Sequence, residues 1–118
     1  MQRPIVVIVE DNPAVRDEVC RLFAGDGNFR IGGVASDGLE GALAAAEIQP
    51  DVVLLDVFLP RWDGWRAAEF IRSNCPDTII VAFASGEAPQ WADCTATKTE
   101  VESVVSFVRR ALDARPAA

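Results

Sequence analysis

The sequence lacks histidine and tyrosine, and it contains a single lysine, Lys98. Any chemistry that needs an imidazole must therefore obtain that group from a partner molecule. The three cysteines, Cys20, Cys75 and Cys94, are odd in number and form no CxxC pair. This usage argues against a disulfide framework and a zinc site, and it favours a reducing cytoplasm as the compartment.

Long hydrophobic runs and clustered basic residues are also missing. No apolar stretch approaches the length of a membrane span, and the N-terminus has no signal-peptide pattern. The formal charge of −7 argues against nucleic-acid binding, because phosphate contacts require grouped Lys and Arg. The 118 residues, half of them apolar, suit one domain over 1–118, with residues 113–118 as a tail or the start of a linker.

Short β-branched runs alternate with helical patterns along the chain. Continuous apolar runs of this length are typical of strands buried on both faces of a parallel sheet. The pattern predicts an α/β fold with a doubly wound parallel sheet. The expected strands lie at 5–10, 29–35, 51–57 and 78–84, with helices after Pro13, over Leu39–Ile48, within 61–75 and after Thr99.

Capping signals mark two of these helices. Asp37 with Glu40, and Thr99 with Glu102, have the spacing of a capping box. In the helix within 61–75, Trp65 shares one face with Ala68 and Ile71, which predicts a core position for the indole.

Acidic residues stand at the ends of two predicted strands. Glu10 and Asp11 end the first strand, and Asp56 ends the third. In an open parallel sheet the carboxyl ends of the strands line the crevice where ligands bind, so these side chains should converge. One such acid alone is equally well explained as a solvated loop residue, but two strand ends together favour a site for Mg²⁺.

The stretches "IVVIVEDNPAVRDEV" and "PDVVLLDVFLPRWDGW" resemble the receiver domain of bacterial two-component response regulators, the CheY-like fold. The resemblance runs from Ile5 to about Gly86 and resumes at the last helix. The acidic pair, the "LLD" strand end, Pro60 and Gly64 all stand where the family has them.

This resemblance implies a flavodoxin-like sheet in the order 2-1-3-4-5. It implies that Asp56 accepts a phosphoryl group from a sensor histidine kinase, a histidine phosphotransfer protein or a small phosphodonor. Asp11, Asp56 and the backbone carbonyl of Phe58 would hold Mg²⁺, with Glu10 holding water or metal behind them. The domain would catalyse both its own phosphorylation and the later hydrolysis.

The family also requires a hydroxyl at the end of strand four and a lysine at the end of strand five. The stretch "FASG" offers Ser85 for the hydroxyl, or places Ala84 there and leaves the hydroxyl out. Lys98 is the single candidate for the lysine. The family's switch aromatic lies three residues before its lysine, and this chain has Thr95 at that place. This departure argues against an aromatic-rotamer switch of the family's kind.

The chain between strands four and five is short. Lys98 stands 13 positions after Ser85, against about twenty-two in an ordinary receiver. If strand five covers 93–97, the connection can close only as extended chain, because helix rises about 1.5 Å per residue. The family's fourth helix should be missing or reduced to a turn; alternatively, "DCTATK" is not a paired strand. Loss of this helix would uncover part of one sheet face: either Trp91 folds back over the gap, or the exposed apolar surface invites a partner or a second copy of the chain.

Three readings of function follow. The first is a phosphorylatable switch, and the second is a degenerate receiver that binds a partner without phosphorylation. A haloacid-dehalogenase-like phosphatase would need an acid where Phe58 stands, so this class is set aside. The uncovered sheet face suggests docking or a homodimer through residues 83–107, while no membrane or nucleic-acid partner is expected.

Overall fold

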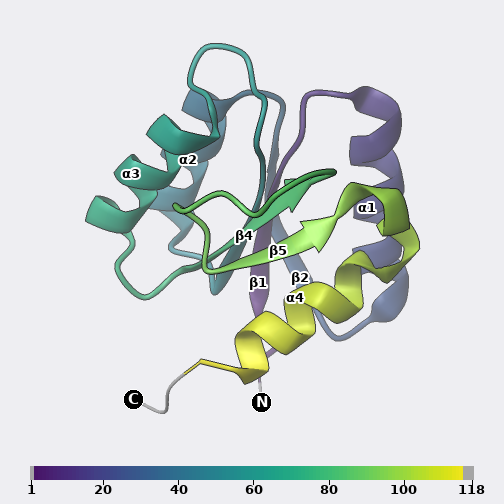
Figure 1. The fold of residues 1–118 in the computed structure, drawn as a ribbon. Coiled ribbons are helices and arrows are strands. Elements are labelled where there is room, and N and C mark those ends of the chain that lie inside the picture. The colour runs from purple at the N-terminus through teal and green to yellow at the C-terminus, as the bar shows by residue number, and fades with distance from the viewer. Residues whose placement is uncertain (1, 116–118) are drawn as a thin grey trace.

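A computed structural model describes residues 2–115, and it forms one five-stranded parallel sheet between two layers of helices (Figure 1). The strand order is β2-β1-β3-β4-β5, as expected. The strands are β1 (Ile5–Val9), β2 (Arg30–Ala35), β3 (Val52–Asp56), β4 (Ile79–Ala84) and β5 (Cys94–Thr97). The helices are α1 (Pro13–Asp26), α2 (Gly38–Ile48), α3 (Gly64–Asn74), the 3₁₀ helix η1 (Lys98–Ser103) and α4 (Val104–Asp113).

Each face of the sheet has its own buried cluster. In Figure 1, α2 and α3 lie on one side of the sheet, while α1 and α4 lie on the other. Phe23 and Val108 are buried between the sheet and the α1–α4 layer. Ala42 and Ile71 are buried between the sheet and the α2–α3 layer. The central strands are therefore buried on both faces, which explains their continuous apolar sequences.

No helix forms between β4 and β5. The nine residues from Ser85 to Asp93 contain bends and a turn closed by a hydrogen bond from the Ala92 N–H to the carbonyl of Pro89 (3.3 Å). β5 still pairs in parallel with β4, from Val81 with Cys94 to Ala84 with Thr97. The expected loss of the family's fourth helix is confirmed, and the alternative of an unpaired "DCTATK" is wrong. The label α4 here denotes the C-terminal helix.

Local capping signals had mixed outcomes. The Asp37 side chain accepts a hydrogen bond from the Glu40 N–H (2.8 Å) and caps α2. The capping box predicted at Thr99 and Glu102 is wrong. Glu100 has non-helical torsions (φ −125°, ψ 56°), so a 3₁₀ segment precedes α4 and the α-helix begins five residues after Thr99, at Val104. The tight turn that follows β5 overrides the sequence signal.

The predicted core position of Trp65 is also wrong. Ala68 and Ile71 are buried, whereas Trp65 is 55% exposed at the first turn of α3. No helix lies between β4 and β5 to pack against this part of α3, and more than half of the indole remains exposed. α4 ends at Asp113, and the rest of the predicted tail lies partly outside the described residues.

No helix within residues 2–115 has both the length and the apolar character that crossing a membrane requires.

Candidate functional site

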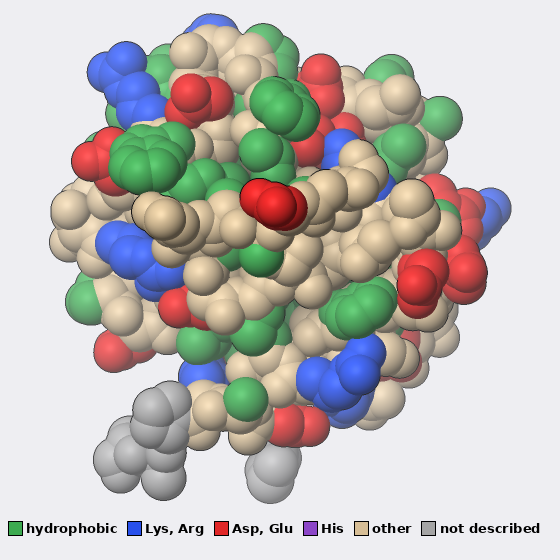
Figure 2. All heavy atoms as spheres, in the orientation of Figure 1, with side chains coloured by type: hydrophobic (Ala, Val, Ile, Leu, Met, Phe, Trp, Pro, Cys, Tyr) green, Lys and Arg blue, Asp and Glu red, His purple; other side chains and the backbone are tan. Residues whose placement is uncertain are grey.

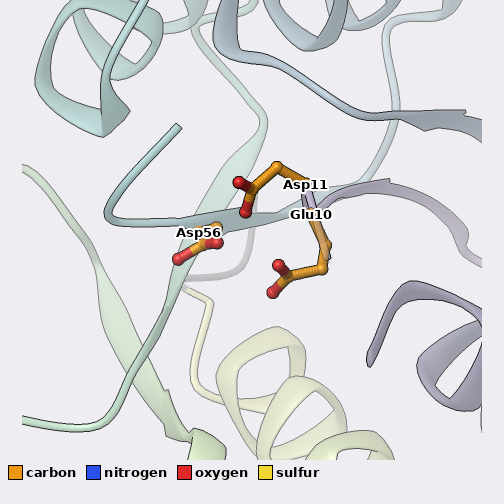
Figure 3. A group of neighbouring side chains, drawn as sticks. All are labelled: Glu10, Asp11 and Asp56. Carbon is orange, nitrogen blue, oxygen red and sulfur yellow. The ribbon is translucent and has the colours of Figure 1, made fainter. Parts of the chain in front are cut away.

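Three carboxylates converge at the carboxyl ends of β1 and β3, as predicted (Figure 3). Glu10, Asp11 and Asp56 each offer an oxygen within 4.8 Å of the others. Asp56 is the last residue of β3, and Glu10 follows β1 directly, so the register of two adjacent parallel strands brings the acids together. Three like charges this close repel one another, and the arrangement fits a hard divalent cation with oxygen ligands.

Glu10 is the least exposed of the three acids, at 1%. One of its oxygens accepts a hydrogen bond from the Asn12 N–H (3.0 Å). Burial raises the pKa of the Glu10 carboxyl, the Asn12 hydrogen bond opposes that shift, and the neighbouring charge of Asp56 adds to it. The nearby ammonium group of Lys98 also acts to lower this pKa.

Lys98 supplies positive charge to this cluster. Its Nζ lies 2.9 Å from Asp56 Oδ1 and 3.1 Å from Glu10 Oε1, where it forms an ion pair without a well-angled hydrogen bond. Burial acts to lower the pKa of Lys98, but Asp56 and Glu10 outweigh that effect and hold the pKa above its ordinary value. The lysine side chain remains 28% exposed and thus reachable from outside. One lysine against three carboxylates leaves the cluster net negative.

Beside Asp56 and Lys98 a pocket of about 170 Å³ opens to the surface. Ser85 carries the hydroxyl among the residues that line it, and Ala84 lines it as well. Ala84 is the last residue of β4, and Ser85 is exposed directly after it. The pocket is therefore polar on the Asp56 and Lys98 side and offers one hydroxyl donor.

The turn after β3 is fixed from several directions. The Phe58 N–H lies 3.3 Å from Asp56 Oδ1, and the phenyl ring of Phe58 is 84% exposed. Arg61, which has a positive φ of 64°, pairs with Asp37 at 2.8 Å. The hydrogen bonds to Arg61 hold the pKa of Asp37 below its ordinary value. This pairing connects the turn after β3 to the first turn of α2.

Sequence reasoning missed Glu87. This acid lines the same pocket as Asp56 three residues after β4, and the rule used for β1 and β3, that acids at strand ends gather, also applies to it. Trp62 packs against the α2–α3 core, with the Arg66 guanidinium 4.4 Å from its ring centroid. At the switch position, Thr95 has a buried hydroxyl without a hydrogen-bond partner within the described residues.

Comparison with known proteins agrees with this geometry. The family model described as "Response regulator receiver domain" matches residues 6–106. This chain is a response regulator receiver domain. The domain takes part in two-component signalling, in which such domains work with histidine kinases or phosphotransfer proteins.

Curated relatives share the receiver part only. A protein-glutamate methylesterase/protein-glutamine glutaminase from Syntrophus aciditrophicus is 34% identical over 94 residues, which is 80% of this chain and 25% of that protein. A probable C4-dicarboxylate response regulator, DctR, from Halalkalibacterium halodurans is 40% identical over 81 residues, 68% of this chain and 35% of that protein. The chain therefore spans about a quarter to a third of the length of these two relatives.

Solved structures share the fold over nearly the whole chain. The response regulator domain of CheB from Thermotoga maritima superposes with a TM-score of 0.85 at 21% identity, covering 98% of this receiver and all of that chain. The receiver domain of NarL from Mycobacterium tuberculosis gives 0.81 at 25% identity, covering 98% and 100%. The short connection between β4 and β5 is therefore compatible with the complete receiver architecture.

Proposed function

We propose that this receiver accepts a phosphoryl group on Asp56 from a phosphohistidine of a sensor kinase or phosphotransfer protein. The observation that carries the proposal is the position of Lys98 Nζ, 2.9 Å from Asp56 Oδ1 at the edge of an open pocket. A buried carboxylate at a strand end, with a cation beside it and access for a donor, is suited to nucleophilic attack on phosphorus. A kinase partner of this kind agrees with a cytoplasmic location.

The acidic cluster is the proposed site of Mg²⁺. Asp11, Asp56 and the backbone carbonyl of Phe58 would hold the ion, and Glu10, which Lys98 and Asn12 already contact, would act from behind through water or the metal. The residues fit the ion because their oxygens are hard ligands and their summed charge stays negative after pairing with Lys98. When bound, the ion would supply positive charge beside the phosphoryl oxygens.

The transfer itself requires one bond to form and one to break. A carboxylate oxygen of Asp56 forms the new P–O bond, the P–N bond of the phosphohistidine breaks, and the departing imidazole takes up a proton from solvent. Lys98 then shifts from the free carboxylate to a phosphoryl oxygen, and Ser85 donates its hydroxyl hydrogen to another. Both residues line the pocket in which the phosphoryl group would sit.

Phosphodonor labelling tests this proposal. Incubation with phosphoramidate and Mg²⁺, read on a phosphate-affinity gel, should convert the wild-type chain and the Asp17→Asn variant, whose acid is exposed on α1. Asp56→Asn should remain unconverted, because the amide is not a nucleophile for phosphorus. Conversion of Asp56→Asn at the wild-type rate would contradict the assignment.

A second candidate, a receiver that binds its partner without phosphorylation, is favoured by Thr95. Thr95 occupies the position of the family's switch aromatic, and its buried hydroxyl has no hydrogen-bond partner within residues 2–115. In this form, docking or a homodimer would use the surface of residues 83–107. Sedimentation with and without phosphodonor separates the candidates: phosphorylation-dependent association supports the first, and association of equal strength in both states supports the second.

A further inference from the structure

The segment 85–93 replaces a helix, and we refer to it as the strap. Its first three residues line the pocket beside Asp56, and its last residue, Asp93, is anchored to the far end of the sheet. The Asp93 carboxylate accepts a hydrogen bond from the Ile80 N–H (2.8 Å) and pairs with Arg72 of α3 (3.2 Å). The strap is therefore anchored at its Asp93 end, although it lacks regular structure.

Trp91 is the large side chain of the strap, and Arg72 fixes it as well. The guanidinium of Arg72 donates to the Trp91 carbonyl (2.7 Å) as well as to Asp93. The indole is partly buried and packs against the α2–α3 core. One arginine thus binds the strap on both sides of Ala92, through the backbone carbonyl of Trp91 and the carboxylate of Asp93.

The Trp91 ring lies against the residue that ends the turn after Asp56. A methyl group added to Gly64 would lie 2.7 Å from Trp91 Cζ2 and 3.0 Å from each of the carbonyl oxygens of Asp56 and Val57. The indole and these two carbonyls therefore approach the same point from different sides. The Gly64 N–H also donates to the Val57 carbonyl (3.2 Å), which closes the turn directly over this contact.

We infer that Trp91 is a positioning residue for the acid site. The indole supports the turn 57–63, which carries the Phe58 carbonyl, and it limits how far that carbonyl moves relative to Asp56. The part of this inference that concerns the Phe58 carbonyl as a metal ligand rests on the proposed function. The part that concerns support of the turn needs only the contact of Trp91 at Gly64. Groups that orient the ligands of a metal commonly change its affinity by about 10-fold to 100-fold when removed.

Trp65 provides a matched control for Trp91 on the same surface. Trp65 and Trp91 both line a hollow of about 460 Å³ between α3 and the strap. Figure 2 shows hydrophobic side chains exposed over this part of the molecule. Trp65 is 55% exposed, whereas Trp91 is partly buried and packs against the α2–α3 core. Trp65→Ala therefore removes an indole from the same hollow without removing the support of the turn.

Amide hydrogen exchange tests the support without any metal. We expect Trp91→Ala to speed exchange of the Gly64 amide by about 10-fold, because the closed turn loses packing on one side. Trp65→Ala should leave that rate within about twofold of wild type. Trp91→Phe keeps an aromatic ring and should give an intermediate rate, and protected amides in β1 and β3 show that each variant is folded. Equal Gly64 rates in Trp91→Ala and Trp65→Ala would overturn the inference.

Mg²⁺ titration by calorimetry adds a readout that a purely structural role would not move. Trp91→Ala should bind Mg²⁺ about 10-fold more weakly than Trp65→Ala. Equal affinities in the two variants would overturn the link from the indole to the metal ligands. Failure of the proposed function has a different signature: wild-type protein would show neither phosphorylation nor Mg²⁺ binding, while the exchange result at Gly64 would still decide whether Trp91 supports the turn.

Discussion

Two regions of the molecule are held in place in different ways: the acid site at the ends of β1 and β3, and the strap between β4 and β5. At the first location, regular strand pairing alone brings Glu10 and Asp56 together. At the second, side chains replace missing secondary structure: Arg72 holds the backbone and Trp91 fills the space where a helix would pack. The geometry of the acid site therefore does not depend on a helix between β4 and β5, because β5 pairs with β4 and Lys98, directly after β5, reaches Asp56.

The largest expected effect concerns Lys98, which follows β5 and contacts the acid site. Lys98→Ala should slow phosphorylation of Asp56 by about 100-fold to 1000-fold, the usual effect of removing one donor that stabilises developing charge. Lys98→Arg keeps the charge but not the geometry, so its phosphorylation rate should fall between those of wild type and Lys98→Ala. Rates measured by intact mass against time check this, and an unchanged rate in Lys98→Ala would show that strand five does not serve the site.

Gly64→Ala should strain the contact between the regions. The added methyl would meet the Trp91 ring and two backbone carbonyls, so we expect a loss of about 1–3 kcal/mol in the free energy of unfolding. Chemical denaturation measures this. Gly25→Ala is the control, since a methyl there meets nothing within 4 Å, and it should be neutral or slightly stabilising. Equal stability of Gly64→Ala and Gly25→Ala would contradict the close packing of Trp91 against Gly64.

Arg72→Ala should loosen the strap alone. The side chain is 43% exposed and binds both Asp93 and the Trp91 carbonyl, so after allowance for solvent screening its removal should cost about 1 kcal/mol. Arg21→Ala, which breaks an exposed pair with Glu18, should cost less than about 0.5 kcal/mol. Denaturant midpoints measure the stability of the two variants. A larger loss of stability in Arg21→Ala than in Arg72→Ala would contradict the stabilising role of Arg72 in the strap.

The smallest expected effect is a pH dependence at Glu10. Because its pKa is raised by burial, the folded state favours the protonated carboxyl: the contribution of this group to stability is complete below the ordinary pKa of 4.5 and is lost as pH rises through the raised value. Glu10→Gln stays neutral and escapes this loss. Without Mg²⁺, the melting temperature of Glu10→Gln should exceed that of wild type at pH 7, and the difference should vanish near pH 4. A difference that grows toward acid would contradict the assigned direction.

Sequence patterns were sufficient where local rules decide the structure. Buried strand runs and acids at their ends predicted the sheet and the cluster of Glu10, Asp11 and Asp56, and the length of the connection predicted the missing helix. Lys98 was found because the chain has no other lysine. The family resemblance supplied the strand order.

Other features depend on tertiary contacts that no local pattern carries. Helical spacing placed Trp65 in the core, but the missing helix leaves the indole exposed. The Thr99 capping box fails because the chain must turn sharply after β5 to begin α4. The contact of Trp91 with Gly64 joins residues far apart in sequence, and the approach of Lys98 to Glu10 depends on strand pairing across the whole sheet.

Intact mass spectrometry after incubation with phosphoramidate tests the central claim most directly, namely that the site functions without the helix. We predict that the wild-type chain gains the mass of one phosphoryl group with Mg²⁺, gains none with EDTA, and gains none in Asp56→Asn. Retention of the unmodified mass by wild-type protein at saturating Mg²⁺ would contradict the claim and leave a receiver fold that serves binding alone.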